Sequence, residues 1–274
     1  MAAPVMLPSR PSGGVVTPAP GRRPVILARG LLTVLAVAAL AEGCATGDRS
    51  SARADVIRQI LPSAVQLRCE RDGGGRRAAS GVVLARDAAT RRAWIVTTRH
   101  FLEPLAPQSV YVSLPGSKEH VAAKLVTVSE RSDLALLEVP EGSGIDTTPA
   151  RLKDTVRLGD EVWVLAFPWG RRMTLSSGVV SQVVPAAAAA DEYEGAARMV
   201  DVSVSYGASG GGVFDMPSGA LVGLIESYRT ARVSVQGTPE RVIEIPVPGE
   251  TTLISAEAIR RFIVEAGLEA FLEP

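Results

Sequence analysis

The chain has 274 residues, of which 46% are hydrophobic and 4% aromatic, and its 29 basic and 29 acidic side chains balance to zero. This apolar fraction is sufficient for a sizeable core and excludes a chain that is disordered throughout. The lack of net positive charge gives no indication of nucleic-acid binding. Two cysteines and two histidines are too few for a disulfide scaffold or a cysteine- or histidine-rich metal site. No metal or other cofactor is therefore expected.

The first 43 residues have the pattern of an export signal, in which arginines precede a short apolar run and then small residues. The uncharged run at 31–41 covers only about half of a ~30 Å hydrocarbon core, which is short for a membrane span. It ends in Leu40-Ala-Glu-Gly-Cys44, which resembles a bacterial lipobox. The resemblance implies lipidation of Cys44 and a lipid anchor in the membrane. Cleavage after Ala41 and an uncleaved N-terminal anchor are the alternatives.

A helix and then many strands are predicted in the rest of the chain. We expect a linker at residues 44–54, and apolar residues at helical spacing from Ser51 to Leu61 predict a short helix that Pro62 ends. Short β-branched runs at 8–15-residue intervals favour a barrel or sandwich over βαβ units. The predicted strands are 64–69, 81–85, 93–97, 110–114, 121–128, 134–139, 162–167, 174–184, 199–204, 212–214 and 220–225.

A composition break near residues 140–148 divides this region into two halves, 55–148 and 149–272. The second half ends in an amphipathic segment, in which Ile259, Phe262 and Ile263 lie on one face. This spacing predicts a closing helix over residues 255–267.

Ser209 lies in the glycine-rich segment Gly207-Ala-Ser209-Gly-Gly-Gly212. A serine hydroxyl becomes an effective nucleophile when a base removes its proton and preset N–H groups receive the resulting oxyanion. A glycine two residues before the serine allows a turn that points the amides of Gly207 and Ser209 at one spot. A flexible glycine-rich turn is the alternative interpretation.

His100 follows an apolar strand, and Asp133 opens another. A neutral imidazole can act as a general base near neutral pH, and a partly buried aspartate can orient it. A capping histidine and a turn aspartate are the alternatives. Together with Ser209, in the chain order His, Asp, Ser, the three residues form a candidate group for acyl-transfer chemistry.

These segments resemble the chymotrypsin-fold serine proteases, and in particular their bacterial HtrA (Deg) branch. The resemblance implies an all-β fold of two antiparallel six-stranded β-barrels with short N-terminal and C-terminal helices. A peptide-binding PDZ domain is common in this branch, but none is expected here because nothing follows the closing helix. The three main matching segments are 95–100, 132–137 and 207–211, supported by 56–65, 80–84, 164–181 and 221–225.

Carried over residue by residue, the resemblance implies that Ser209 is the nucleophile, His100 the general base and Asp133 the residue that orients the imidazole. The amides of Gly207 and Ser209 would form the oxyanion hole. Ala208 departs from the family pattern, in which a polar residue usually precedes the serine.

The family's substrate pocket is lined by residues just before the serine and by the strand after it. Ser203 stands at the base of the pocket, and its lack of negative charge argues against a preference for arginine or lysine. We expect small or aliphatic substrate side chains instead, with Glu226 as an unexplained polar group. The corresponding segments of this chain are 203–206 and 224–227, in which the expected substrate-binding residues are Ser203, Tyr206, Leu224, Ile225 and Glu226.

The sequence therefore favours an exported serine endopeptidase on the periplasmic side of the cell envelope. Its partners would be polypeptide substrates, namely unfolded or damaged envelope proteins, and not nucleic acids. One alternative is a proteolytically inactive trypsin-like fold that serves as a binding or scaffolding module. The other is a small-ester hydrolase, or a sugar- or lipid-binding barrel, that shares only the strand pattern.

Overall fold

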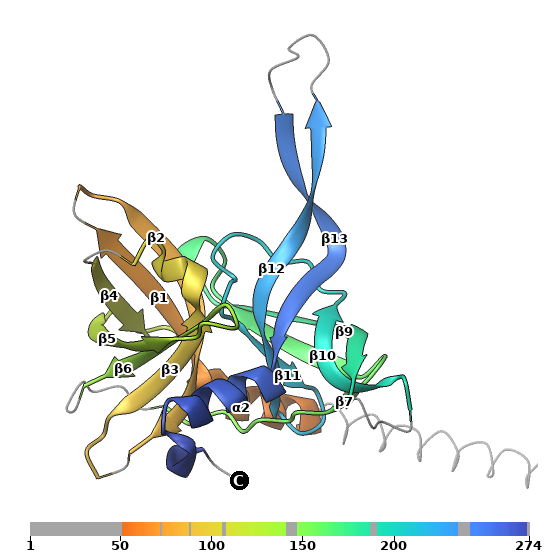
Figure 1. The fold of residues 1–274 in the computed structure, drawn as a ribbon, viewed down its shortest axis with the longest axis horizontal. Helices are drawn as coiled ribbons and strands as arrows, with labels where there is room; N and C mark the ends of the chain where they lie inside the picture. The colour runs from red at the N-terminus through yellow and green to blue at the C-terminus, as the bar shows by residue number, and fades with distance from the viewer. Residues whose placement is uncertain are drawn as a thin grey trace, which may run out of the picture. The chain divides into compact units, whose positions relative to one another are not determined.

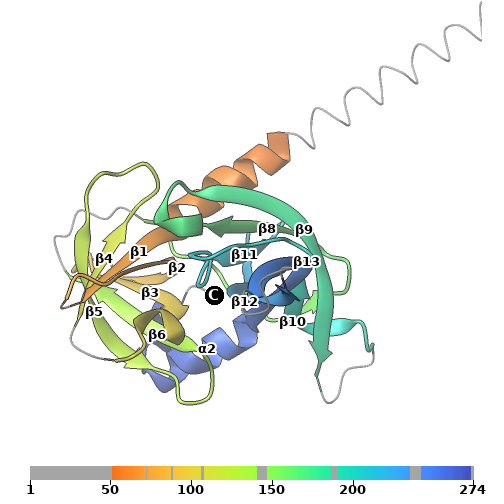
Figure 2. The same ribbon diagram turned by 90° about the horizontal axis from the view of Figure 1, so that it is seen from above.

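The computed structural model describes residues 51–71, 73–87, 89–105, 108–140, 147–186, 191–234 and 242–272, which belong to the compact unit Ser50–Pro274. In this part of the chain the antiparallel strands form two barrels that stand side by side (Figure 1, Figure 2). The expected signal at residues 1–43 and Cys44 lie outside the described residues. Among the helices that are described, none is long and apolar enough to cross a bilayer.

The first barrel is a closed ring of six antiparallel strands in the order β1-β2-β3-β6-β5-β4. Alternate residues point into the barrel, so that Val65, Leu67 and Cys69 of the first strand are fully buried in its interior. The strands are β1 (Ala64–Arg71), β2 (Arg76–Arg86), β3 (Ala93–Thr98), β4 (Gln108–Ser113), β5 (Val121–Val128) and β6 (Leu134–Val139).

The second barrel is built from a sheet in the order β13-β12-β11-β8-β9-β10-β7. An additional pairing of β13 with β10 closes a ring of six strands, and the two-residue β7 adds a seventh strand next to β10. The strands are β7 (Val156–Arg157), β8 (Glu161–Ala166), β9 (Thr174–Pro185), β10 (Glu194–Val200), β11 (Gly212–Asp215), β12 (Leu221–Ser234) and β13 (Val242–Ser255).

Helices flank the two barrels, as predicted. Residues 51–60 are helical and lead through η1 (Leu61–Ser63) into β1, so the helix already begins within the expected linker at 44–54. The closing helix α2 (Ala256–Glu265) starts at Ser255, whose hydroxyl accepts a hydrogen bond from the Ala258 N–H at 3.3 Å. This N-terminal cap satisfies one of the free amides of the first helical turn. The predicted all-β, two-barrel architecture with short flanking helices is therefore confirmed.

A shared hydrophobic cluster joins the two barrels. Each barrel has its own core, and a third cluster combines the outward faces of β2, β3 and β6 with β8, β11, β12 and α2. Because strands such as β3 are buried on both faces, they read as continuous apolar runs. The larger members of this cluster are Ile60, Leu84, Trp94, Leu134, Leu136, Leu165, Phe167, Phe214, Leu221, Leu224, Ile254, Ile259, Phe262 and Ile263.

The strands after the serine differ most from the sequence-based expectation. The predicted run 220–225 continues in the structure as β12 to Ser234, and β13 was not predicted at all. The β-branched pattern of β13 is interrupted by Pro246, Pro248 and Gly249. For this reason the local pattern did not predict a strand. The two strands form the β12–β13 hairpin, whose outer part projects beyond both barrels (Figure 1).

The run predicted at 199–204 is also shifted, because β10 covers residues 194–200. The expected boundary between the halves, at residues 148 and 149, falls in the connection between β6 and β7.

Candidate active site

His100 and Asp133 of the first barrel are in direct contact. His100 Nδ1 lies 2.5 Å from Asp133 Oδ2, and the His100 backbone N–H donates to Asp133 Oδ1 at 2.8 Å. An ionised carboxylate only accepts hydrogen bonds, so this contact places the imidazole proton on Nδ1. The lone pair of Nε2 is then available on the other side of the ring.

The pairing of β3 with β6 brings these two residues together, although they lie 33 positions apart. The register runs from Ala93 opposite Val139 to Thr98 opposite Leu134, so the end of β3 meets the beginning of β6. The short helix η2 (Arg99–Leu102) starts at the end of β3 and carries His100. Asp133 immediately precedes β6 at the same edge of the barrel.

A tight turn holds Asp133 in place. The buried hydroxyl of Ser129 accepts hydrogen bonds from the N–H groups of Arg131 and Ser132, at 3.2 and 3.1 Å. The Asp133 carbonyl accepts from the Arg99 N–H at 3.1 Å, which ties the turn to η2. Backbone bonds on both sides therefore limit the movement of the carboxylate relative to the imidazole.

Ser209 comes from the second barrel, in a tight turn directly before β11. Gly207 and Gly210 have φ angles of +87° and +78°, a left-handed conformation that favours glycine. A Cβ atom on Gly210 would lie 2.2 Å from the Ser80 carbonyl oxygen and 2.4 Å from Thr97 Oγ1. Glycine at position 210 is therefore what allows the serine turn to approach the first barrel.

The amides of Gly207 and Ser209 donate no hydrogen bond within the described residues. The carbonyl that precedes Gly207 accepts from the Trp169 N–H at 2.7 Å, and the carbonyl that precedes Ser209 accepts from the Gly211 N–H at 2.8 Å. In a trans peptide the N–H points opposite to the C=O. Fixing the two carbonyls therefore fixes the directions of two unpaired N–H groups, both on residues that line one cavity.

Ser80 of β2 connects the serine turn to the first barrel, and the sequence did not indicate this role. Its hydroxyl is buried, donates to the Gly207 carbonyl at 2.9 Å and accepts from the Phe167 N–H at 2.8 Å. Its backbone N–H donates to the Ser209 carbonyl at 2.9 Å. One residue of the first barrel thus holds the turn of the second barrel at two points.

His100, Asp133, Gly207 and Ser209 all line one cavity of about 810 Å³. Ser209 Oγ donates to the Glu226 carbonyl at 3.5 Å, near the outer limit of a hydrogen bond. No hydrogen bond joins Ser209 to His100 within the part of the chain that is described. The serine therefore lies in the same cavity as the imidazole, with its hydroxyl held weakly by β12.

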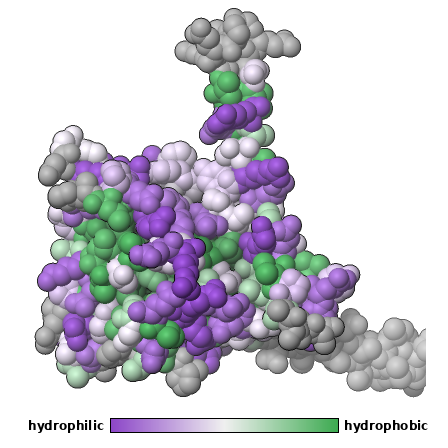
Figure 3. All heavy atoms as spheres, viewed as in Figure 1, coloured by the Kyte–Doolittle hydropathy of each residue, from purple (hydrophilic) through white to green (hydrophobic). Residues whose placement is uncertain are grey.

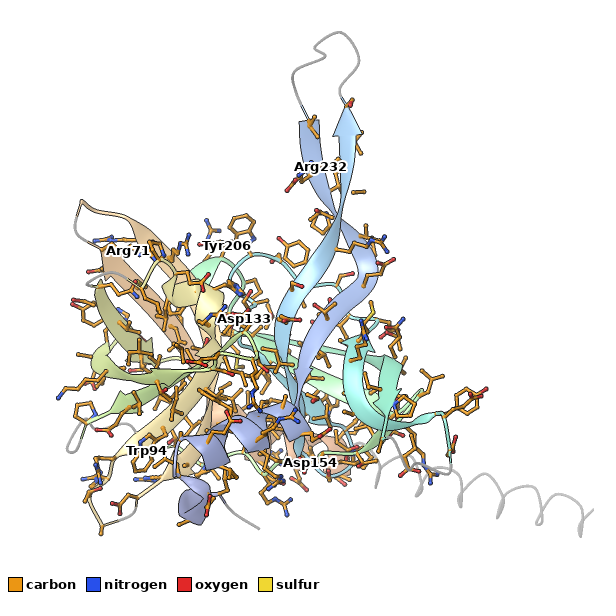
Figure 4. All side chains as sticks on the ribbon, viewed as in Figure 1. Arg71, Trp94, Asp133, Asp154, Tyr206 and Arg232 are labelled. Atoms are coloured by element: carbon orange, nitrogen blue, oxygen red, sulfur yellow. The ribbon has the colours of Figure 1, made fainter. Side chains whose placement is uncertain are left out.

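The predicted substrate-binding residues fall into two groups. Tyr206 and Glu226 line the cavity. Asp133 lines the same cavity and lies between the first barrel and β12 (Figure 4). The side chains of Leu224 and Ile225 are buried in the shared cluster and in the second-barrel core, and Ser203 is exposed outside the cavity lining. Ser227, which ends the expected lining segment 224–227, also lines the cavity. The lining contains further residues that were not predicted, namely Arg77, Ala78, Ala79, Phe101, Tyr228 and Thr230.

Burial raises the pKa of the Glu226 carboxyl above its ordinary value, and the negative charge of Asp133 raises it further. A hydrogen bond from Thr252 and the charges of His100 and Arg198 act in the opposite direction without cancelling the shift. Glu226 therefore keeps its proton to a higher pH than an exposed glutamate.

A family model for the trypsin-like peptidase domain matches residues 79–224. Periplasmic serine endoprotease DegP of Escherichia coli (strain K12) is 28% identical over 158 residues, covering 56% of this chain and 31% of that protein. A probable periplasmic serine endoprotease, DegP-like, of Ectopseudomonas mendocina (strain ymp) is 25% identical over 212 residues, covering 75% of this chain and 40% of that protein. The chain thus spans less than half the length of these relatives.

Among solved structures, the HtrA-type protease AlgW with a tripeptide matches with a TM-score of 0.56 at 17% identity. The match covers 80% of this chain and 64% of that one, and it supports the fold. The family model covers more than half of the 274 residues. The chain therefore belongs to the trypsin-like peptidase family.

Proposed function

We propose that the chain is a serine endopeptidase in which Ser209 is the nucleophile, His100 the general base and Asp133 the residue that orients the imidazole. The observation that carries the proposal is that side chains from two barrels line one cavity, with His100 Nδ1 2.5 Å from Asp133 Oδ2. Membership of the trypsin-like peptidase family supports the same assignment.

In the proposed reaction, Ser209 Oγ attacks the carbonyl carbon of a peptide bond while its proton passes to His100 Nε2. The carbonyl oxygen becomes an oxyanion, to which the N–H groups of Gly207 and Ser209 donate. The imidazolium then gives its proton to the leaving amine, and an acyl-enzyme remains. Water, deprotonated by His100, hydrolyses this ester and restores the serine.

Before attack, the Ser209 hydroxyl must exchange its weak bond with the Glu226 carbonyl for a bond with His100. A rotation about the Cα–Cβ bond of the serine provides this exchange, and catalytic hydrogen bonds are often long before substrate binds. A 3.5 Å bond gives little resistance to such a rotation.

The substrates that we propose are unfolded or damaged polypeptides on the periplasmic side of the cell envelope. The relatives described above are named as periplasmic serine endoproteases, and the signal expected at residues 1–43 is consistent with export. We propose the same preference for small or aliphatic side chains that the sequence indicates.

We further propose that lipidation of Cys44 anchors the chain to the membrane. Mass spectrometry of the mature protein is the test. A diacylglycerol on an N-terminal Cys44 supports the anchor, and a free terminus elsewhere excludes it.

A second candidate function is a binding module that has this fold but no peptidase activity. The observation in its favour is that Ser209 donates to the Glu226 carbonyl and not to His100. In this alternative the serine would keep that bond when a polypeptide occupies the cavity.

Labelling with a fluorophosphonate, which reacts with activated serines, separates the two functions. We expect labelling of the full chain, loss of labelling in Ser209→Ala, and full labelling in Ser177→Ala, which alters an exposed serine of β9. Degradation of casein should follow the same order. Absence of labelling and of casein cleavage in the folded wild-type protein would leave the binding module as the better description.

A further inference from the structure

The cavity that contains Ser209 has two ends. One end is lined by β12, and the other by residues 77–79 of β2 together with Phe101. Ser209 lies between them, because its hydroxyl donates to the Glu226 carbonyl of β12 at 3.5 Å and its carbonyl accepts from the Ser80 N–H of β2 at 2.9 Å. We call the part lined by residues 77–79 and Phe101 the β2 end of the cavity. An extended polypeptide that crosses Ser209 therefore meets β12 on one side of the cleaved bond and the β2 end on the other.

Two backbone carbonyls hold the guanidinium of Arg77, which brings a positive charge to the β2 end. Its Nη1 donates to the His100 carbonyl at 3.1 Å and to the Glu103 carbonyl at 2.8 Å. Its Nε and Nη2 donate to no group among the residues that the structure describes. These two nitrogens direct their N–H groups along one edge of the guanidinium plane, and such an edge binds both oxygens of a carboxylate. The side chain is thus fixed in place while its carboxylate-binding edge stays unoccupied.

No carboxylate pairs with Arg77 in the described part of the chain. Arg71, which also donates to the Glu103 carbonyl, has no carboxylate partner among these residues either. The Glu103 carboxylate pairs instead with Arg99, at 3.0 Å. Within the described residues, the two arginines therefore place uncompensated positive charge at and beside the β2 end, and such charge attracts an anion.

The β2 end lies next to the residue that protonates the leaving group in the proposed reaction. Phe101 follows His100 in η2, and the guanidinium of Arg77 is bonded to the His100 carbonyl. Because His100 gives its proton to the leaving amine, the fragment that leaves begins beside the imidazole. The acidic residues of the cavity do not occupy Arg77, since Asp133 is bonded to His100 and Glu226 belongs to the β12 end. The leaving fragment would therefore extend over the β2 end.

We propose that the free edge of Arg77 binds a carboxylate of the leaving fragment, so that the protein favours substrates with an acidic group in the first three residues after the cleaved bond. The inference rests on the proposed peptidase function and deepens it, because it names a class of substrate. The carboxylate belongs either to an aspartate or glutamate side chain or to the C-terminus of a short leaving fragment. Figure 3 shows hydrophilic and neutral side chains on the surface between the first barrel and the β12–β13 hairpin, which suits a charged ligand.

The adjacent arginine of β2 provides a matched control. The side chain of Arg76 points to the opposite face of the strand, pairs with Glu70 at 3.2 Å and does not line the cavity. Arg77→Gln and Arg76→Gln each remove one positive charge, but only the first removes the free edge. Arg77→Glu reverses the charge at the site and tests its sign.

The substrates are peptides built on one casein cleavage site, which mass spectrometry of the digest identifies. Each of the first three residues after the cleaved bond is replaced in turn by glutamate or by glutamine, which have the same shape, and the C-terminus is amidated. For one position at least, kcat/KM of the full-length enzyme should be about three- to tenfold higher with glutamate, between the effects of an exposed ion pair and of a hydrogen-bonded charge. In about 1 M salt this ratio should approach one.

Arg77→Gln should bring the ratio close to one, Arg76→Gln should leave it as in the wild type, and Arg77→Glu should favour lysine at the same position. Peptides that end there in a free carboxylate or an amide show whether a C-terminus serves equally. A wild-type ratio near one for both kinds of carboxylate, a preference confined to residues before the cleaved bond, or a ratio that Arg77→Gln does not change would overturn the proposal. If Arg77→Gln does not fold, as judged by circular dichroism, Arg77→Lys replaces it; it keeps the charge without the fork and should lower the ratio.

A binding measurement distinguishes failure of this inference from failure of the peptidase function. Anisotropy of fluorescein-labelled, dephosphorylated casein reports binding to the full-length Ser209→Ala protein without catalysis. Weaker binding after Arg77→Gln, but not after Arg76→Gln, supports the carboxylate site even if the wild-type chain cleaves nothing, in which case only the peptidase function fails. If the wild-type chain cleaves casein while the two arginine variants bind it equally well, the inference about Arg77 is wrong and the peptidase function stands.

Discussion

Replacing Ser80 by alanine should reduce both stability and turnover, because its hydroxyl connects the two barrels at the serine turn. The substitution leaves the Gly207 carbonyl and the Phe167 N–H without their partner, at bonds of 2.9 and 2.8 Å. A buried polar group left unpaired costs about 1–3 kcal/mol. For two such groups we expect the free energy of unfolding to fall by about 2–4 kcal/mol in total.

Turnover should fall for a separate reason. Without the Ser80 hydroxyl, the peptide between Gly207 and Ala208 keeps only the bond from its N–H to the Ser205 carbonyl at 3.0 Å. This peptide lies between the two candidate oxyanion donors, so a looser peptide should misplace the amides of Gly207 and Ser209 relative to each other. Complete loss of one oxyanion donor costs about 10²–10³ in kcat, so partial misplacement should cost about 10–100-fold. KM should change little, because these donors act on charge that develops in the transition state.

Ser63→Ala is the matched control. Ser63 is also buried, its hydroxyl donates to the Ile60 carbonyl at 2.7 Å, and it does not line the cavity. Urea unfolding and cleavage of a fluorogenic peptide should show lower stability in both variants and a lower kcat only in Ser80→Ala. If kcat of Ser80→Ala stays within about twofold of wild type while stability falls, the oxyanion reasoning is wrong.

Two further substitutions probe the scaffold. Gly210→Ala should abolish fluorophosphonate labelling and lower the melting temperature, since its Cβ would lie 2.2 Å from the Ser80 carbonyl oxygen; a normally labelled variant would contradict this geometry. Burial raises the pKa of Asp215, but hydrogen bonds from Lys153 (2.6 Å) and Ser218, with the Lys153 charge, outweigh it and lower that pKa overall. The resulting stabilisation is present above the unfolded pKa near 4 and is lost as pH falls through the lower folded pKa. In urea unfolding between pH 6 and 2, the free energy of unfolding should therefore fall less steeply with acid in Asp215→Asn than in the wild-type protein. An unchanged fall would exclude this contribution.

The strands with simple local patterns could be predicted from sequence to within a few residues. The runs at 121–128 and 134–139 coincide with β5 and β6, because each is a short apolar or β-branched segment bounded by turn residues. β13 could not be predicted, since its prolines and glycine look like a loop when read locally. Its strand conformation depends on pairing with β12, which supplies hydrogen bonds where the local pattern is broken.

In the candidate site, too, some residues could be predicted from sequence and others could not. His100, Asp133 and Ser209 were found from their residue types and chain order, and the structure brings them to one cavity. Ser80 carried no signal, because a serine within a strand acquires its role only from the Gly207 carbonyl and the Phe167 N–H that approach it from the other barrel. The buried positions of Leu224 and Ile225 likewise follow from which face of β12 meets the cores.

By itself, the sequence determined that short antiparallel strands dominate the fold, and it indicated candidate residues for acyl transfer, since both follow from residue type and local periodicity. Only the tertiary structure decided the directions of the free amides, the connection through Ser80 and the projecting β12–β13 hairpin. These features depend on contacts between segments far apart in the chain, and such contacts form only when the hydrophobic cluster shared by the two barrels is assembled.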